Sequence, residues 1–296
     1  MKTLIIANPV AGGGRTRRLW PTLQNLLAPS FGLYEVAWSE RPGDATRLAR
    51  QAKKYQRVVA CGGDGTIHEV ANGLFSVPEE ERPSLGCLSL GTGGDFIKSL
   101  GIPKNLRRQI AILINNREAK IDVGEITFGS DREKKIFLNV ADAGMGAEVI
   151  RRLDRRLGQK LGYLSASLLT YLRRRPHWME IRIEGKPAWS GQALLAVVAN
   201  GRCFGGGMQI APQADLQDGR FDLIVIKDLA PLWIPLTIAL LYTRQLRRLP
   251  QVSLFRAAEV EINSPETVHL DIDGEPIGSL PVRFRILPRA LRVIAP

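Results

Sequence analysis

The chain has 296 residues, of which 45% are hydrophobic and 24% charged, which is typical of a soluble globular protein long enough for two domains. The formal net charge of +12 indicates an anionic partner: a nucleotide, a nucleic acid or an acidic membrane surface. Three cysteines without a Cys-x-x-Cys spacing argue against a disulfide framework and against a zinc site. No secretory signal precedes the first apolar run, so we expect a cytoplasmic protein.

Strand-like and helix-like patterns alternate four times in the first 120 residues. The predicted strands are residues 2–7, 33–38, 57–60 and 84–90, and the main predicted helices are residues 17–27, 44–54, 67–74 and 106–115. Asp44 is the expected N-cap of its helix. The alternation predicts a doubly wound α/β domain, whose ligands bind outside the carboxyl ends of the strands.

Three glycine-rich loops follow predicted strands and therefore fall on that edge. They are Asn8–Gly14, Gly62-Gly63-Asp64-Gly65-Thr66 and Gly91-Thr92-Gly93-Gly94-Asp95-Phe96. Glycines let backbone N–H groups converge on an anion, and a helix N-terminus adds a positive dipole end. Thr66 and Glu69 match a capping box, which marks such a helix start. One glycine loop alone could be an ordinary turn, but three together predict a phosphate site, with Asp64 beside a phosphate-bound metal.

Beyond about residue 120 the pattern changes to short strands with few helices, which predicts a mostly antiparallel β-domain. The expected strands are residues 121–127, 135–141, 180–183, 193–200, 221–227, 259–262, 269–273 and 282–286. Two helical stretches interrupt them, at residues 148–175 and 231–248. The most apolar run, residues 229–243, has about fifteen residues and is short of the roughly 20 needed to span a bilayer.

The three loops, together with Ser39-Glu40-Arg41-Pro42-Gly43-Asp44-Ala45 and Asp273-Gly274-Glu275, occur in the order and spacing of the diacylglycerol kinase catalytic-domain family. The chain resembles that family, which includes bacterial soluble lipid kinases, sphingosine kinases and ceramide kinases, over nearly its whole length. The resemblance implies an NAD kinase- and phosphofructokinase-like α/β nucleotide domain at residues 1–122. It also implies a β-sandwich lipid-substrate domain at residues 123–287 and a return of residues 288–296 to the first domain.

The activity that the resemblance implies is transfer of the γ-phosphate of ATP to a lipid hydroxyl, on diacylglycerol or a similar lipid, with Mg²⁺. Asp64, Asp95 and Asp122 would surround the catalytic Mg²⁺. Glu275 would be the general base, supported by Asp273, although such a tripeptide taken alone is usually a hairpin turn. The residues that would line the nucleotide are Asn8, Pro9, Val10, Ala11, Gly12, Ser39, Gly63, Asp64, Gly65, Thr66, Glu69, Thr92 and Asp95.

A second, structural Mg²⁺ is implied at Asp215, Asp218 and the backbone carbonyl of Arg220, and an acidic turn without a metal is the alternative. The chain departs from the family pattern at two positions. Gly94 stands where the family usually has asparagine, and Gly146 where it usually has an acid. Either change could alter the substrate preference or lower the activity.

Arginines flank residues 161–172 of the first helical stretch and stand at the end of the second, and they predict peripheral association with an anionic membrane surface that holds the lipid substrate. They are Arg151, Arg152, Arg155, Arg156, Arg173, Arg174, Arg175, Arg244, Arg247 and Arg248. Packed helices with solvated arginines are the alternative. No nucleic-acid module is recognisable, so no nucleic-acid partner is expected, while a homodimer stays open. The alternative functions are an NAD kinase-like small-molecule kinase and a non-catalytic nucleotide- or lipid-binding protein.

Overall fold

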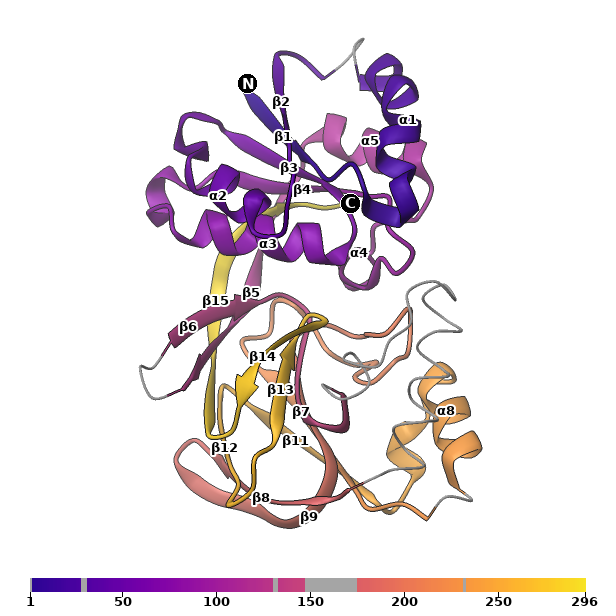
Figure 1. Ribbon diagram of the computed structural model, residues 1–296, viewed down its shortest axis with the longest axis vertical. Coiled ribbons are helices and arrows are strands. Elements are labelled where there is room, and N and C mark those ends of the chain that lie inside the picture. The colour runs from indigo at the N-terminus through magenta and orange to yellow at the C-terminus, as the bar shows by residue number, and fades with distance from the viewer. Residues whose placement is uncertain (1, 28–30, 130–132, 147–174, 231–232) are drawn as a thin grey trace. The chain divides into compact units, whose positions relative to one another are not determined.

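The computed structural model describes residues 2–27, 31–129, 133–146, 175–230 and 233–296 (Figure 1). It forms two compact units, unit 1 with Met1–Asp122 and Arg289–Pro296, and unit 2 with Val123–Pro288. The strands β5 (Glu118–Phe128) and β15 (Val282–Ile294) each contribute residues to both units. The predicted helix at 148–175 falls almost entirely outside the described residues, as do its arginines up to Arg174.

Unit 1 is built on a parallel sheet with the strand order β4-β3-β1-β2. Their bounds are β1 (Thr3–Ala7), β2 (Tyr34–Trp38), β3 (Arg57–Gly62) and β4 (Ser84–Ser89). The end of β15 joins β4 through a parallel pairing of Val293 with Leu85. β1 and β3 are buried along their whole length, as unbroken apolar runs predict for strands covered on both faces.

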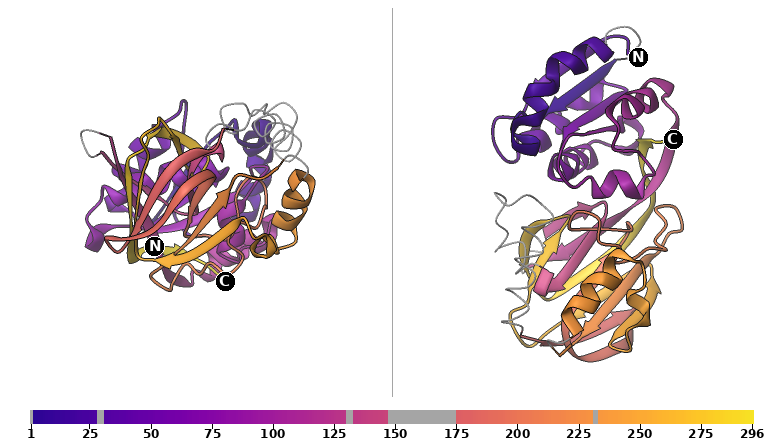
Figure 2. Two further views of the ribbon diagram at one scale, coloured as in Figure 1. Left: turned by 90° about the horizontal axis from the view of Figure 1, so that it is seen from below. Right: turned by 90° about the vertical axis from the view of Figure 1, so that its right-hand side faces the viewer.

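Helices cover both faces of this sheet (Figure 2). On one face, α1 (Ala11–Leu27) and α5 (Leu106–Asn115) bury Leu23 and Leu113 against Ile5, Val59 and Leu88. On the other face, α2 (Asp44–Arg50) and α3 (Asp64–Phe75) pack together. Shorter turns complete the unit: α4 (Asp95–Ser99) and the 3₁₀ turns Ala52–Lys54 and Glu79–Glu81. The predicted doubly wound α/β fold is confirmed.

The predicted capping box of α3 is wrong. The helix begins at Asp64, two residues before Thr66, and makes no side-chain cap hydrogen bond. The hydroxyl of Thr66 instead accepts a hydrogen bond from Asn8 Nδ2 at 3.2 Å. The Glu69 carboxylate accepts one from the backbone N–H of Ala45, also at 3.2 Å. Both side chains therefore tie α3 to other segments of unit 1.

Asp44 is likewise not the N-cap of α2. That position belongs to Gly43, which has a φ of 86°, and Asp44 is the first helical residue. Its carboxylate accepts hydrogen bonds from the backbone N–H groups of Glu40 and Arg41, at 3.0 and 3.2 Å. The acid therefore holds the loop between Ser39 and α2, because those N–H groups precede the helix and have no helical partner.

Unit 2 is a β-sandwich of mostly antiparallel strands. One path runs β14-β13-β7-β9-β8-β12-β15, while β10 pairs with β9 and β11, and β6 pairs with β5. The bounds are β6 (Glu133–Phe137), β7 (Val140–Gly144), β8 (His177–Ile183), β9 (Lys186–Ala199), β10 (Phe221–Lys227), β11 (Val252–Ala257), β12 (Glu259–Asn263), β13 (His269–Ile272) and β14 (Glu275–Ser279). The predicted fold class is confirmed.

The structure also contains features of unit 2 that the sequence pattern did not predict. Residues 135–141, expected as one strand, belong to β6 and β7, and β11 and β14 were not expected at all. The predicted helix at 231–248 is the shorter α8 (Ile234–Tyr242), followed by a 3₁₀ turn at Leu246–Arg248. Among the described residues, no helix is long and apolar enough to cross a membrane.

Candidate functional site

The strand order of unit 1 places the glycine loops at one position on the sheet. β1 lies between β2 and β3, so the chain leaves β1 toward one side of the sheet and later continues on the other. In α/β proteins, ligands bind outside the carboxyl ends of the strands at such a switch point. The loops after β1 and β3 lie at this point of the sheet, and the loop after β4 is next to them.

Direct contacts join the three loops into one backbone surface. Asn8 links the first loop to the second through its bond to Thr66, and its own carboxamide oxygen accepts from Val10 N at 3.1 Å. The second and third loops touch at Gly63 and Gly91, where a Cβ on Gly91 would lie only 2.7 Å from the Cα of Gly63. A side chain at position 91 would therefore push the loops apart, and the predicted convergence of the loops is confirmed.

Most of the predicted nucleotide residues lie on or beside these loops. Ser39 follows β2 and donates its backbone N–H to the carbonyl of Ala7 at 2.9 Å, which places it next to the first loop. Thr92 is exposed, and its carbonyl accepts a hydrogen bond from Lys104 Nζ at 3.2 Å. Lys104 was not predicted, because it lies twelve residues beyond Thr92, outside the loop that it contacts. Glu69, by contrast, points to α2.

Asp64 is the central acid of the loop surface. Its two carboxylate oxygens accept backbone N–H groups from the third loop, Gly94 at 2.8 Å and Phe96 at 3.3 Å. Burial, and then the nearby carboxylate of Asp95, raise the pKa of Asp64 above its ordinary value. The Asp64 carboxylate keeps this position despite its burial and despite the neighbouring Asp95 carboxylate. It is therefore a candidate ligand for a cation, because a cation would offset the repulsion between the two carboxylates.

The other acids predicted around Mg²⁺ have separate partners. Asp95 forms an ion pair with Lys98 at 2.7 Å. Asp122 is completely buried, and its carboxylate accepts the backbone N–H of Arg289 at 2.7 Å, within unit 1. No cluster of three or more His, Cys, Asp or Glu side chains suited to a metal occurs among the described residues. Asp64 and Asp95 nevertheless fit Mg²⁺, which takes only one or two carboxylates when phosphate oxygens and waters complete its shell.

In unit 2, Asp273 holds the turn that presents Glu275. Its carboxylate accepts three backbone N–H groups, from Leu138 at 2.7 Å, Asn139 at 2.9 Å and Val140 at 3.0 Å. These bonds separate β6 from β7, because the N–H groups between the two strands point at the carboxylate. Glu275 is half-buried and opens β14 directly after the turn. The structure thus gives Asp273 a holding role.

Replacing Asp273 by asparagine should lower the free energy of unfolding of unit 2 by about 2–4 kcal/mol. The amide keeps one acceptor oxygen and turns donors toward N–H groups, whereas hydrogen bonds to a charged group contribute about 1.5–3 kcal/mol each. Denaturant unfolding of the full chain measures the loss. The control is Asp215→Asn, whose carboxylate accepts one N–H, from Gln217 at 3.1 Å in an exposed loop. Equal stability of both variants would contradict the holding role.

The loop predicted to carry a second Mg²⁺ contains an ion pair. Asp218 Oδ1 accepts the backbone N–H of Arg220 at 2.9 Å, and Asp218 Oδ2 pairs with the guanidinium of Arg256. Arg256 also lies 3.7 Å from the Asp222 carboxylate. A guanidinium therefore supplies positive charge to this loop, and the second metal ion at Asp215, Asp218 and Arg220 stays a prediction.

The structure accommodates glycine at both positions where the chain departs from the family pattern, 94 and 146. Gly94 has a φ of 63°, a conformation that asparagine tolerates better than most residues, so the exchange preserves the turn that directs its N–H to Asp64. At position 146, a Cβ would lie 2.2 Å from Oδ1 of Asp142. The carboxylate of Asp142, a buried acid on β7 directly opposite Asp271, thus takes the space of a side chain at position 146. Its place inside an otherwise apolar strand was the available sequence signal.

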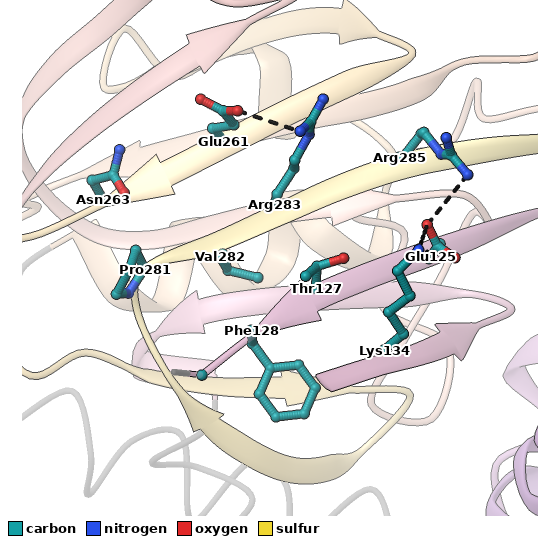
Figure 3. A pocket seen from close by; sticks show the side chains of 11 residues that line it. Glu125, Thr127, Phe128, Lys134, Glu261, Asn263, Pro281, Val282, Arg283 and Arg285 are labelled. Atoms are coloured by element: carbon teal, nitrogen blue, oxygen red, sulfur yellow. Dashed lines mark hydrogen bonds and ion pairs between the residues drawn. The ribbon is translucent and has the colours of Figure 1, made fainter. Parts of the chain in front are cut away.

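A hollow of about 510 Å³ lies elsewhere in unit 2, on β5, β6, β12 and β15 (Figure 3). Ion pairs cross it, from Arg285 to Glu125 at 3.4 Å and from Arg283 to Glu261 at 3.8 Å. Phe128 and Pro281 form part of its wall. None of the predicted site residues lines it, so the hollow and the glycine loops are distinct features.

Comparison with known proteins identifies the family. The family model of the diacylglycerol kinase catalytic domain matches residues 2–126, and that of the YegS C-terminal NAD kinase beta sandwich-like domain matches residues 139–295. The "Probable lipid kinase YegS-like" protein of Yersinia enterocolitica is 30% identical, over 99% of this chain and 97% of its own. The chain belongs to the diacylglycerol kinase catalytic-domain family. The predictions of this family and of a lipid kinase as the class of enzyme are confirmed.

Solved structures of the family's fold agree with this assignment. The crystal structure of a "putative diacylglycerol kinase" from Bacillus anthracis str. Sterne is 26% identical and superimposes with a TM-score of 0.85, over 100% of this chain and 95% of that one. An NAD kinase from Archaeoglobus fulgidus, solved in complex with ATP, is 13% identical with a TM-score of 0.55 over 99% of this chain and 93% of that one. The second likeness shows a shared fold alone.

Proposed function

We propose that this member of the diacylglycerol kinase family transfers the γ-phosphate of ATP to the hydroxyl group of diacylglycerol or a similar lipid. The observation that supports the proposal best is Asp64, held by Gly94 and Phe96 at the first turn of α3. It stands where three glycine loops meet at the switch point of a parallel sheet. A surface of backbone N–H groups with one acid at its centre suits a polyphosphate and its counterion.

The three loops bind and orient the phosphates in this proposal. Phosphoryl transfer depends mainly on positioning and on stabilisation of negative charge, and a backbone surface that does not rearrange supplies both. The contact between Gly63 and Gly91 and the bond from Asn8 to Thr66 keep the loops in place before the nucleotide binds. Mg²⁺, with Asp64 and Asp95 as its protein carboxylates, would neutralise charge on the phosphates when bound.

Glu275 is the proposed general base that removes the proton of the lipid hydroxyl. A carboxylate can do so only when it is held in a defined position near the acceptor oxygen. Asp273 provides the holding through its three backbone N–H bonds, and the Gly274 N–H bonds Asp271 Oδ1 at 2.9 Å. The turn is thus braced on both sides immediately before Glu275, which supports a catalytic rather than a merely connecting role.

Incubation with γ-labelled ATP and a total lipid extract tests the reaction. Label in a lipid phosphate supports the proposal, and mass spectrometry of the labelled product identifies the acceptor. Formation of NADP from ATP and NAD would favour an NAD kinase-like enzyme instead. Nucleotide binding without turnover of either acceptor would favour a non-catalytic binding protein.

We further expect the enzyme to associate peripherally with anionic membranes, which would bring it to its lipid substrate. The net charge of +12 supports this expectation. Association with phosphatidylserine-containing vesicles should weaken steeply as salt rises, because the attraction decays within a Debye length of roughly 8 Å at physiological ionic strength. Co-sedimentation across a salt series measures it. Equal binding to neutral and anionic vesicles would show that the charge plays no part.

A further inference from the structure

Within the described part of the chain, the helix α8 packs against the sandwich of unit 2 (Figure 2). Leu241 of α8, with Leu246 and Leu249 after it, is buried in a cluster that includes Ile224 and Ile226 of β10. Leu240 packs partly against the same cluster. These contacts fix α8 and the segment that follows it on the sandwich. The side chains on the opposite face of the helix therefore point away from this cluster.

The other face of α8 is exposed and mostly apolar. Trp233, which precedes the helix, is 42% exposed, and Leu236 and Tyr242 are each 43% exposed. Positions 236, 239 and 242 lie three residues apart, which places them on neighbouring turns of one helix face, and Ala239 between them is exposed as well. A row of large apolar side chains on one surface indicates an interaction site.

The threonines of α8 and of its C-terminal cap do not add free hydroxyl donors to the surface of the helix. The hydroxyl of Thr237 bonds to the carbonyl of Trp233 at 2.8 Å, and that of Thr243 to the carbonyl of Ala239 at 2.9 Å. Each hydroxyl donates its proton to the preceding turn of the helix. Both hydroxyl donors therefore keep a hydrogen-bond acceptor when the helix is transferred to an apolar environment.

The chain segment that contains α8 carries charges of one sign. The sequence from Leu229 to Ala258 contains no aspartate or glutamate. Arg244, Arg247 and Arg248 follow the helix and are exposed. Arg244 has a φ of 63°, which ends the helix and turns the chain into the 3₁₀ turn that carries the other two. Cationic side chains thus stand at one end of the apolar face.

We propose that α8 is the membrane-docking element of this lipid kinase, with an anionic bilayer surface as its partner. Leu236, Tyr242 and Trp233 enter the interface between headgroups and acyl chains, and the three arginines contact the anionic headgroups. Aromatic side chains favour that interface, and cations beside it favour anionic lipids. A helix of nine residues is too short to span the bilayer, so it lies on the surface.

This inference rests on the proposed function, because a kinase that acts on a membrane lipid has to reach the bilayer. Its test uses the full chain and vesicles of phosphatidylcholine with or without phosphatidylserine. The double variant Leu236→Ser/Tyr242→Ser should bind anionic vesicles about tenfold more weakly than the parent chain. The control is Trp178→Ser, a change at a side chain of β8 that is 40% exposed, and it should bind as the parent does.

The charged part of the surface has its own matched pair. Arg247→Glu removes one positive charge and adds a negative one, and each charge near an anionic surface changes the affinity about fivefold. Its binding to anionic vesicles should therefore fall more than tenfold. Lys186→Glu makes the same change at an exposed position of β9, and binding should change much less. Circular dichroism verifies that the variants remain folded.

Tryptophan fluorescence supplements the test, because it needs only Trp→Phe substitutions, which change the fold little. Anionic vesicles should shift the tryptophan emission of the parent chain to shorter wavelength, and Trp233→Phe should remove most of that shift while Trp178→Phe keeps it. The proposal is overturned if the parent chain ignores anionic vesicles. It is also overturned if the variants of α8 bind and fluoresce in vesicles as their controls do.

Turnover of a short-chain diacylglycerol dissolved as monomers separates the two proposals. The variants of α8 should phosphorylate this soluble acceptor as fast as the parent chain, and should lose activity only toward diacylglycerol in vesicles. Failure of the parent chain on the soluble acceptor as well as on a lipid extract refutes the proposed reaction, whatever the vesicle binding shows. Full activity of the variants toward vesicle-bound lipid refutes the docking role alone.

Discussion

Replacing Asp64 by asparagine is expected to lower turnover by at least about 10²-fold, the scale on which a preorganised electrostatic group usually contributes to catalysis. Asparagine keeps an acceptor for the Gly94 N–H but loses the charge that would face a phosphate-bound cation. The rate of lipid phosphorylation at saturating Mg²⁺ measures the loss. Titration with a fluorescent ATP analogue, with and without Mg²⁺, shows whether the Mg²⁺-dependent part of nucleotide binding disappears with it.

The raised pKa of Asp64 gives this variant a second expected result. Because the folded-state pKa exceeds the unfolded value, the folded protein binds the proton more tightly, and the free energy of unfolding falls as pH rises through the folded-state pKa. The ionised carboxylate thus costs stability at neutral pH. Asp64→Asn should therefore unfold at a denaturant concentration no lower than the parent chain, although its activity is lost.

A matched control separates loss of charge from loss of loop structure. The Glu184 carboxylate of unit 2 also accepts two backbone N–H groups, from Ala258 at 2.9 Å and Glu259 at 3.4 Å. Glu184→Gln should leave turnover unchanged. Normal activity and normal Mg²⁺ dependence of Asp64→Asn would contradict the proposed role of Asp64, whereas loss of activity in both variants would indicate a structural effect.

The sheet of unit 1 could be predicted from the sequence because its signals are local. Residues 4–7 and 58–60 are unbroken apolar runs, and both lie in central strands whose two faces are covered by helices. Each run is followed by a glycine-containing loop, so one local pattern predicts the strand, the loop and the edge of the sheet where ligands bind. The topology then brings the loops together without further information from the side chains.

Strands that depend on distant partners could not be predicted in this way. β14 contains Pro276 and Gly278, two residue types that are depleted in strands, and its pairing with β13 shifts register at Asp271. It forms beside a turn whose acids, Asp271 and Asp273, accept backbone N–H groups. β11 has half-buried and exposed side chains before its last residue, the buried Ala257, and this weak pattern is completed by pairing with β10.

The same limit applies to the polar residues of the site. Thr66 and Glu69 carry a local capping motif, yet their partners are Asn8 and Ala45, far away in the sequence. Spacing alone could place Asp64 beside a phosphate. It could not show that N–H groups thirty residues further on hold the carboxylate, because competition between local and distant hydrogen bonds is settled by packing.

Glu275→Gln is expected to lower the rate of lipid phosphorylation by at least roughly 10²-fold and to leave ATP binding largely unchanged, because general-base catalysis contributes on that scale and the amide is not basic. The change keeps the size of a half-buried side chain next to a braced turn, so the stability of unit 2 should stay near that of the parent chain. Asp273→Asn, by contrast, should lower the stability of unit 2 more than Glu275→Gln does.

The measurement that decides between a base and a merely structural acid is single-turnover phosphorylation of a soluble short-chain diacylglycerol at saturating ATP. Glu275→Gln should be slow in this assay because the chemical step itself is affected. The control is Glu266→Gln, an acid of the same unit that pairs with His177 at 2.7 Å, and it should react at the parent rate. If Glu275→Gln also reacts at the parent rate, the proton goes to another group. Asp273 would then be the next candidate, since it lies two residues before Glu275, in the turn that leads into β14.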